Sequence, residues 1–291
     1  MPKSQIHTEL VNQYFAARSD QVYAVSDLEH LFIEKHDEWN LPPSMTSYTF
    51  LQMLLTRTHL SQLRLRSRHY SSPILYSWEG KASPMSVALR IKKDSAFFSH
   101  ESAMWIHGLN ENHNNIFINN EQSPKPKSSS YLSQEGIDRA FQNQQRYSKL
   151  FYKYQDTRII LINGKHSGQL EVQQSQAPSG HPVDVTSLER TLVDITVRPG
   201  YSGGVPAVLQ AFRSARGRIS VTKLLGVLRK LDYTYPYHQS IGFYLERAGY
   251  SQADQTLAKD LGAKFDFYLS HGLQNPAFDP NWRVFFPKRL K

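Results

Sequence analysis

The sequence predicts an α+β protein of two domains, in which a small helical N-terminal domain precedes a larger mixed α/β domain. The first eighty residues contain three helical patterns that end in a short hairpin, whereas the remainder mixes strand-like segments with a series of helices over 187–261. The chain has 291 residues, of which 40% are hydrophobic, so two cores of ordinary size can form. The polar stretch "EGKASP" at 79–84 is the predicted joint, which gives domains 1–80 and 81–291.

The three N-terminal helices are predicted from the spacing of apolar residues and from capping signals. The first covers residues 5–17, and the second begins at "SDLE", where Ser26 is the expected N-cap and Glu29 completes a capping box. The third covers residues 44–56. On a helical wheel, four apolar side chains of this helix share one face: Phe50, Leu51, Leu54 and Leu55. Four polar side chains lie on the opposite face: Thr46, Thr49, Gln52 and Thr56.

The polar face of the third helix suits the major groove of DNA. It carries no acidic side chain that phosphates would repel. A Gln side chain can pair with adenine in bidentate fashion, and Thr offers base edges both a hydroxyl and a methyl group. We therefore expect this helix to read base edges.

The hairpin "LRLRSRHYSSPILYSW" at 63–78 alternates leucine with arginine. Arg64 and Arg66 share one face, Arg57 and Arg68 flank them, and no acidic residue lies between Arg57 and Trp78. The arginine guanidinium forms strong, often bidentate hydrogen bonds with phosphate, so this face is predicted to lie along a DNA backbone. The alternative is that the arginines only protect the edge of a sheet. Three helices followed by such a hairpin predict a winged helix-turn-helix, a DNA-binding fold.

Basic side chains also gather in the C-terminal third of the chain. The formal net charge is +9, and residues 201–291 hold thirteen basic and six acidic side chains. Arg213, Arg216 and Arg218 lie together at the end of a predicted helix and are further candidates for contacts with phosphate. A basic solvated surface that binds nothing would give the same composition.

The composition also predicts where the protein works. No stretch approaches the ~20 apolar residues that span a bilayer. The N-terminus lacks the apolar segment of a signal peptide, and the chain contains no cysteine. These features predict a cytoplasmic protein without disulfides and without membrane attachment.

Three local predictions concern the second domain. "DVTSLERTLVDITVRPGYSGG" at 184–204 predicts a helix with a capping box of Thr186 and Glu189. Ser99 is the predicted N-cap of a short helix that Gly108 ends. "GKHSG" at 164–168 is interpreted as a hairpin turn between strands.

Two stretches of the second domain resemble a known family. "FFSHESAMWIHGL" at 97–109 and "VTSLERTLVDITVRPGYSGGVPAVLQAF" at 185–212 are similar to signature stretches of AbiEi-type antitoxins, and "FDPNWRVFFP" at 278–287 is similar to the ending of some members. The chain departs from that pattern in its long, Asn/Gln-rich residues 110–180.

The resemblance implies the antitoxin of a type IV toxin–antitoxin system that serves phage defence. Such a protein is a transcriptional repressor that joins an N-terminal winged helix to a C-terminal α/β domain. It binds double-stranded operator DNA, expected here to contain inverted repeats. It thereby limits expression of a nucleotidyltransferase-like toxin that it need not touch.

Two other functions remain open at the sequence level. Asp184, Glu189 and Asp194 could belong to a metal-dependent nuclease that a winged helix delivers to DNA, and an antitoxin could instead neutralise its toxin by direct contact. We expect no enzyme activity, no cofactor and no metal, because Glu189 is explained by capping and the histidines lack the spacing of zinc ligands.

Overall fold

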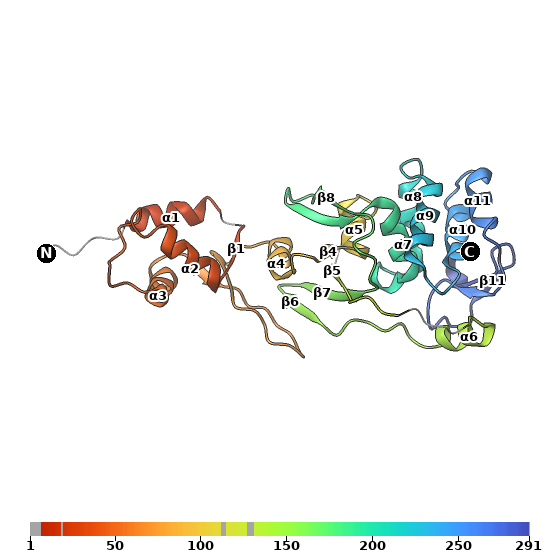
Figure 1. Cartoon of the computed structure of the whole chain (residues 1–291), viewed down its shortest axis with the longest axis horizontal. Helices are drawn as coiled ribbons and strands as arrows, with labels where there is room; N and C mark the ends of the chain where they lie inside the picture. Colours follow the sequence, from red (N-terminus) through yellow and green to blue (C-terminus); the bar gives the residue numbers. More distant parts are fainter. Residues whose placement is uncertain (1–6, 19, 112–114, 127–130, 291) are drawn as a thin grey trace. The chain divides into compact units, whose positions relative to one another are not determined.

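The computed structural model describes residues 7–18, 20–111, 115–126 and 131–290. The chain forms two compact units (Figure 1). The first consists of residues 1–92 and 150–159, and the second of 93–149 and 160–291. The predicted joint at 79–84 thus falls ahead of a last helix of the first unit, α4 (Pro84–Ile91).

The first unit combines helices with a small antiparallel sheet. Its elements before α4 are α1 (Thr8–Ala16), β1 (Val22–Ala24), α2 (Val25–Glu34), α3 (Ser47–Arg57), β2 (Leu60–Gln62) and β3 (Leu75–Trp78). The sheet has the order β1-β3-β2. Its core is rich in aromatic residues: Phe15, Trp39 and Phe50 are fully buried among the helices. All three predicted helices are therefore present: α1 lies within 5–17, α2 begins ahead of Ser26, and α3 is displaced from 44–56 to Ser47–Arg57.

The predicted cap of α2 is wrong. The helix begins at Val25, its N-cap is Ala24, and the Asp27 carboxylate accepts a hydrogen bond from the Ala24 amide at 2.7 Å. Ala24 is also the last residue of β1, where it pairs with Leu75 of β3. The strand runs directly into the helix, so the helix begins ahead of Ser26.

The hairpin segment beyond β2 is held on two sides. The Leu63 amide donates to the Leu75 carbonyl at 2.8 Å. On the other side, Arg66 pairs with Lys153 of β6 (Phe151–Tyr154) through two backbone hydrogen bonds, of 2.9 and 2.7 Å. Since 150–159 belongs to the first unit, this pairing is internal to that unit.

The second unit is built on a mixed sheet. Its strands are β4 (Phe97–Phe98), β5 (Asn115–Glu121), the end of β7 (Thr157–Gly164), β8 (Val172–Gln176) and β9 (Pro182–Thr186). The sheet order is β6-β7-β5-β4-β9-β8, and β4 runs parallel to β9. A further sheet has the order β10-β12-β11, formed by Phe267–Tyr268, Val284–Phe286 and Ala277–Asp279. The mixed α/β, or α+β, fold class is confirmed.

A helical core packs beside these sheets. Figure 1 shows α7 to α11 gathered in one part of the second unit. The helices are α5 (His100–Ile106), α6 (Gln134–Gln142), α7 (Leu188–Val197), α8 (Val205–Ala215), α9 (Val221–Leu231), α10 (Tyr237–Arg247) and α11 (Gln252–Lys259), with two short 3₁₀ helices, η1 (Pro199–Tyr201) and η2 (Lys288–Leu290). Leu192, Leu224 and Ile241 are fully buried in this core, and the series of helices predicted over 187–261 is present. Among the described residues, no helix is long and apolar enough to cross a membrane.

The predicted capping box of α7 is wrong by one residue. Ser187 is the N-cap, and its hydroxyl accepts the Arg190 amide at 3.3 Å. Thr186 ends β9, where it pairs with Val172, and its hydroxyl lies 2.8 Å from that of Thr191. The strand therefore keeps Thr186 extended, and the next serine caps the helix.

The prediction for α5 is confirmed in position: Ser99 is its N-cap residue, and Gly108, with a φ of 66°, follows its C-cap His107. Ser99 makes no side-chain capping bond, and its hydroxyl is 2.8 Å from His100 Nδ1. The prediction for 164–168 is wrong. Residues 164–168 are not a hairpin turn, because β7 and β8 are not neighbours in the sheet. Instead, the Ser167 amide donates to the Glu121 carboxylate at 2.8 Å. The sequence "SPKPKSSS" at 123–130 predicts a loop, of which residues 127–130 lie outside the described residues.

Candidate nucleic-acid interface

The exposed face of α3 is polar, as the sequence predicts. Phe50 and Leu54 are fully buried. Five predicted site residues are exposed on or beside the helix: Thr46, Thr49, Gln52, Thr56 and Arg57. The helix therefore presents hydroxyl and amide groups outward while its leucine face holds it to the first unit.

The threonine hydroxyls of this face are engaged with the helix itself. Thr46 is the N-cap, and its hydroxyl accepts the Thr49 amide at 3.2 Å. The Thr56 hydroxyl donates to the Gln52 carbonyl at 2.7 Å. Within the part of the chain that the structure describes, the Gln52 side chain has no hydrogen-bond partner. Gln52 is therefore the group on this face best able to pair with a ligand.

The sequence argument missed a large side chain on the same face. Tyr48, in the first turn of α3, is 70% exposed. Because it lies four residues before Gln52, its side chain projects from the same side of the helix. The available signal was an aromatic residue on a face otherwise made of short polar groups.

A basic edge lies on the hairpin of the first unit. Leu63 and Leu65 are buried, whereas Arg64, Arg66 and Arg68 are exposed. Directly paired residues in an antiparallel ladder point to the same side, so Lys153, which is exposed opposite Arg66, adds its charge to that side. We call Arg64, Arg66 and Lys153 the basic edge.

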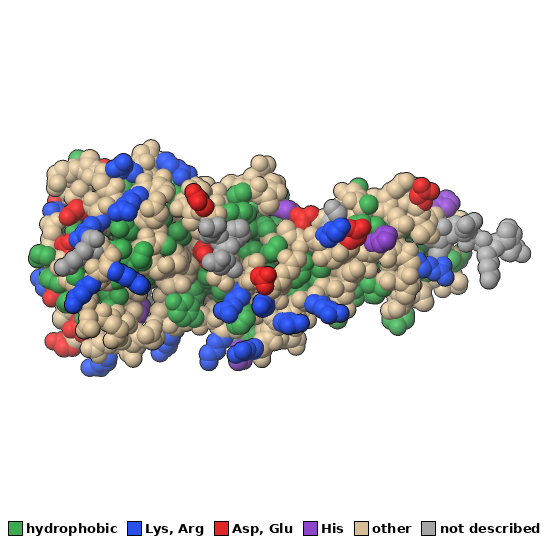
Figure 2. Space-filling model, turned by 180° about the vertical axis from the view of Figure 1, so that it is seen from behind, with side chains coloured by type: hydrophobic (Ala, Val, Ile, Leu, Met, Phe, Trp, Pro, Cys, Tyr) green, Lys and Arg blue, Asp and Glu red, His purple; other side chains and the backbone are tan. Residues whose placement is uncertain are grey.

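Lys153 could not be found from the sequence, because it is distant from the hairpin along the chain. Figure 2 shows Lys and Arg side chains gathered around the β2–β3 connection, with few acidic side chains among them. The pairing also weakens the alternative interpretation of the arginines, since Arg66 is not at an open strand edge.

The basic edge and α3 are neighbours within the first unit. Helix α3 packs against β2. A groove is lined both by Leu55 of α3 and by residues 60–65 of the hairpin. Leu55, from the apolar face of α3, and Arg64 of the hairpin thus lie on the wall of one groove.

The second predicted basic cluster has a different character. Arg213, Arg216 and Arg218 are exposed near the end of α8. Arg216 donates to the Gly249 carbonyl at 3.2 Å, and Arg218 donates to the His107 carbonyl at 2.7 Å. Two of the three guanidinium groups therefore hold neighbouring segments of the second unit together.

The three carboxylates of the nuclease hypothesis have separate structural surroundings. Asp194 is buried and pairs with Arg190 at 2.8 Å. Glu189 pairs with Lys223 at 3.2 Å, and Asp184 lies in β9. Burial raises the pKa of the Asp194 carboxyl, although Arg190 acts in the opposite direction. Among the described residues, no group of three or more His, Asp or Glu side chains is placed to hold a metal ion.

Comparisons with known proteins show a shared fold. No family model and no curated protein matches the chain. The crystal structure of the RV2827C protein from Mycobacterium tuberculosis is similar, with a TM-score of 0.60 at 14% sequence identity. The match covers 98% of this chain and 93% of that one. The similarity thus extends over both units and establishes the fold alone.

Proposed function

We propose that this protein is a DNA-binding transcriptional repressor whose recognition surface is α3 together with the basic edge. The observation that carries the proposal is that one unit holds both features: α3, which packs against β2 and has an exposed polar face without acids, and the exposed side chains of Arg64, Arg66 and Lys153. The order α1-β1-α2-α3-β2-β3, with a three-stranded antiparallel sheet, is the order expected of a winged helix-turn-helix.

The two parts of the surface contribute different interactions. Gln52 has an unpaired amide, so it can donate to and accept from one base edge. The basic edge meets phosphates, which positions the protein on the duplex without reading its sequence. Specificity would come from the helix, and much of the affinity and its dependence on salt would come from the edge.

The biological setting follows from the resemblance to AbiEi-type antitoxins. In that setting the protein represses its own operon and limits a nucleotidyltransferase-like toxin without needing to contact it. Cytoplasmic action on double-stranded operator DNA is part of this proposal. The alternative mechanism is direct neutralisation of the toxin by contact. Co-purification of the toxin with the full chain tests it.

Titration of DNA by fluorescence anisotropy tests the proposal. The full chain should bind DNA from upstream of its own gene more tightly than a scrambled duplex of the same length. The double variant R64A/R66A should lose affinity for both duplexes, whereas Arg218→Ala, an exposed arginine whose guanidinium donates to the His107 carbonyl, is the matched control. Equal binding by the double variant and the parent protein would refute the proposed surface.

The nuclease alternative has its own test. The parent protein and Glu189→Gln are incubated with DNA and magnesium or manganese. The repressor hypothesis expects no cleavage by either protein and unchanged DNA binding by the variant. Cleavage by the parent protein that the variant has lost would establish an enzyme instead.

A further inference from the structure

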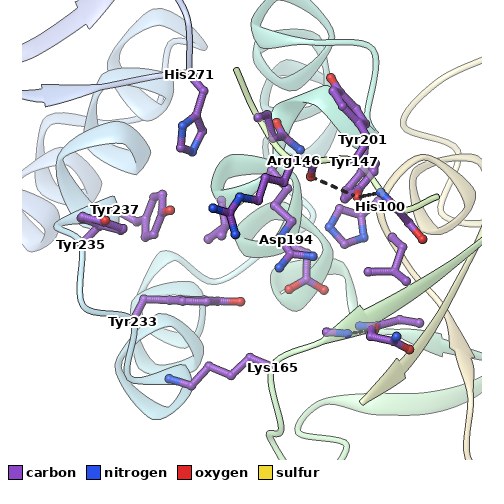
Figure 3. A pocket seen from close by; sticks show the side chains of 18 of the residues that line it. His100, Arg146, Tyr147, Lys165, Asp194, Tyr201, Tyr233, Tyr235, Tyr237 and His271 are labelled. Carbon is purple, nitrogen blue, oxygen red and sulfur yellow. Dashed lines mark hydrogen bonds between the residues drawn. The ribbon is translucent and has the colours of Figure 1, made fainter. Parts of the chain in front are cut away.

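A large pocket lies within the second unit, apart from the surface proposed for DNA. Its volume is about 850 Å³, within the usual range for sites that bind small molecules. Its walls come from residues 143–148, from the end of β7, from α7 and from the α9–α10 connection. Figure 3 shows Tyr233, Tyr235 and Tyr237 on one side, His100 and Tyr201 on the other, and Asp194 between them.

The lining carries more positive than negative charge. Four cationic side chains, Arg146, Lys165, Arg190 and Arg198, face a single acidic one, Asp194. Asp194 pairs with Arg190, and Lys165 Nζ donates to the Leu231 carbonyl at 2.7 Å. Within the described ranges, the guanidinium groups of Arg146 and Arg198 have no hydrogen-bond or ion-pair partner, although that of Arg198 lies 5.9 Å from the centre of the Tyr201 ring. Two cations without a hydrogen bond or ion pair on the wall of one pocket favour an anionic ligand.

Among the residues that the structure describes, two buried polar atoms of the lining also have no hydrogen-bond partner. Asp194 is 4% exposed, and its Oδ2 accepts no hydrogen bond. Gln145 Oε1 accepts the Gly200 amide at 3.2 Å, but its buried Nε2 donates to nothing. A buried polar atom without a partner is rare in a native protein. Here an acceptor and a donor are both left for groups that enter the pocket.

The remaining lining is aromatic and includes a strained residue. His100 is buried with a φ of 53°, in the left-handed region that is costly for such a residue. Burial, followed by the charge of Arg198, holds the pKa of its imidazole well below the usual range, so the ring is neutral at neutral pH. Tyr233 and Tyr235 are only partly buried, although Lys165 Nζ lies 5.3 Å from the centre of the Tyr233 ring and Tyr235 stacks on Phe267. Their remaining exposed surface can contact a planar ring.

We propose that this pocket binds a nucleoside phosphate. Arg146 and Arg198 would hold the phosphate, the tyrosines of the α9–α10 connection would stack on the base, and Asp194 Oδ2 and Gln145 Nε2 would pair with sugar or base groups. A free inorganic anion satisfies only the first of these features, and an apolar ligand satisfies none of the charged ones. The site is independent of the proposed DNA surface.

Calorimetric titration of the full chain tests this site. The probes are AMP, GMP, CMP and UMP and their triphosphates, with the unphosphorylated nucleosides and inorganic phosphate as comparisons. We expect saturable binding of at least one nucleotide at one site per chain. Arg146→Gln and Arg198→Gln should each weaken it by about tenfold, the loss expected when a charged hydrogen bond disappears.

Matched variants separate this site from general attraction to a basic protein. Arg213→Gln, an exposed arginine outside the pocket, and Arg66→Gln, on the basic edge, should bind the nucleotide as the parent protein does. Thermal unfolding checks that each variant is folded. The proposal is overturned if no nucleotide binds, if inorganic phosphate binds equally well, or if Arg66→Gln causes the loss and the pocket variants do not.

Discussion

Two arginines of the first unit and two of the second have different surroundings, although the sequence gives no sign of the difference. Arg64 and Arg66 of the first unit are exposed on its hairpin. Arg190 of the second unit is buried against Asp194, and Arg218 donates to the backbone of His107. One set is available to a ligand, whereas the other set links segments of the fold.

The comparison teaches that positive charge by itself does not identify a binding surface. The residues 201–291 carry most of the net charge of +9, yet Arg216 and Arg218 are already engaged by carbonyl oxygens. A guanidinium whose donors are satisfied gains less from a phosphate, because it must give up an existing hydrogen bond. The number of unpaired donors is therefore a better guide than the number of arginines.

The largest effect is expected where an arginine is buried. Arg190→Ala would leave Asp194 unpaired in the interior, at a cost of about 3–5 kcal/mol in the free energy of unfolding. Urea denaturation measures it. A decrease in the free energy of unfolding no larger than that of an ordinary surface substitution would mean that Arg190 does not stabilise the fold. The contrast between Arg64 and Arg66 on one side and Arg190 and Arg218 on the other would then be lost.

The next effect concerns sequence preference rather than folding. Gln52→Ala should cost about 1–3 kcal/mol in binding to the cognate operator and little in binding to random DNA. The free energy of unfolding should change little, because the side chain is exposed and unpaired. Anisotropy with both duplexes measures the difference. Equal losses on both would exclude α3 from base recognition.

A smaller effect distinguishes the observed cap of α7, Ser187, from the predicted one, Thr186. Ser187→Ala should cost about 0.5–2 kcal/mol in the free energy of unfolding, since the helix loses its N-cap. DNA affinity should be unchanged in the folded protein. Thermal unfolding of Ser187→Ala beside Thr186→Ser, which keeps a hydroxyl at the strand end, provides the comparison. A larger loss in the Thr186 variant would contradict the observed cap.

The smallest effect is expected for single arginines at the surface. Arg66→Ala should lower the slope of log affinity against log salt concentration by about one unit, as one phosphate contact is lost. Arg218→Ala should leave the slope nearly unchanged, because its guanidinium donates to the His107 carbonyl. Binding curves at several salt concentrations measure both slopes. An equal change in both variants would make the C-terminal arginines part of the DNA surface.

The sequence by itself determined the features that depend on neighbouring residues. The alternation that buries Leu63 and Leu65 and exposes Arg64 and Arg66 follows from the two-residue period of a strand. The polar face of α3 follows in the same way from the helical period. Such patterns can be read without knowing what packs against them.

Only the tertiary structure decided the features that depend on distant residues. Lys153 joins the basic edge through its pairing with Arg66, and the pocket brings Arg146 beside residues of α7 and the α9–α10 connection. The start of α7 at Leu188 was decided in the same way, because the pairing of Thr186 with Val172 keeps that residue in a strand. Contacts between residues that are far apart in the sequence leave no periodic pattern in it. The positions of these side chains therefore could not be predicted from local patterns.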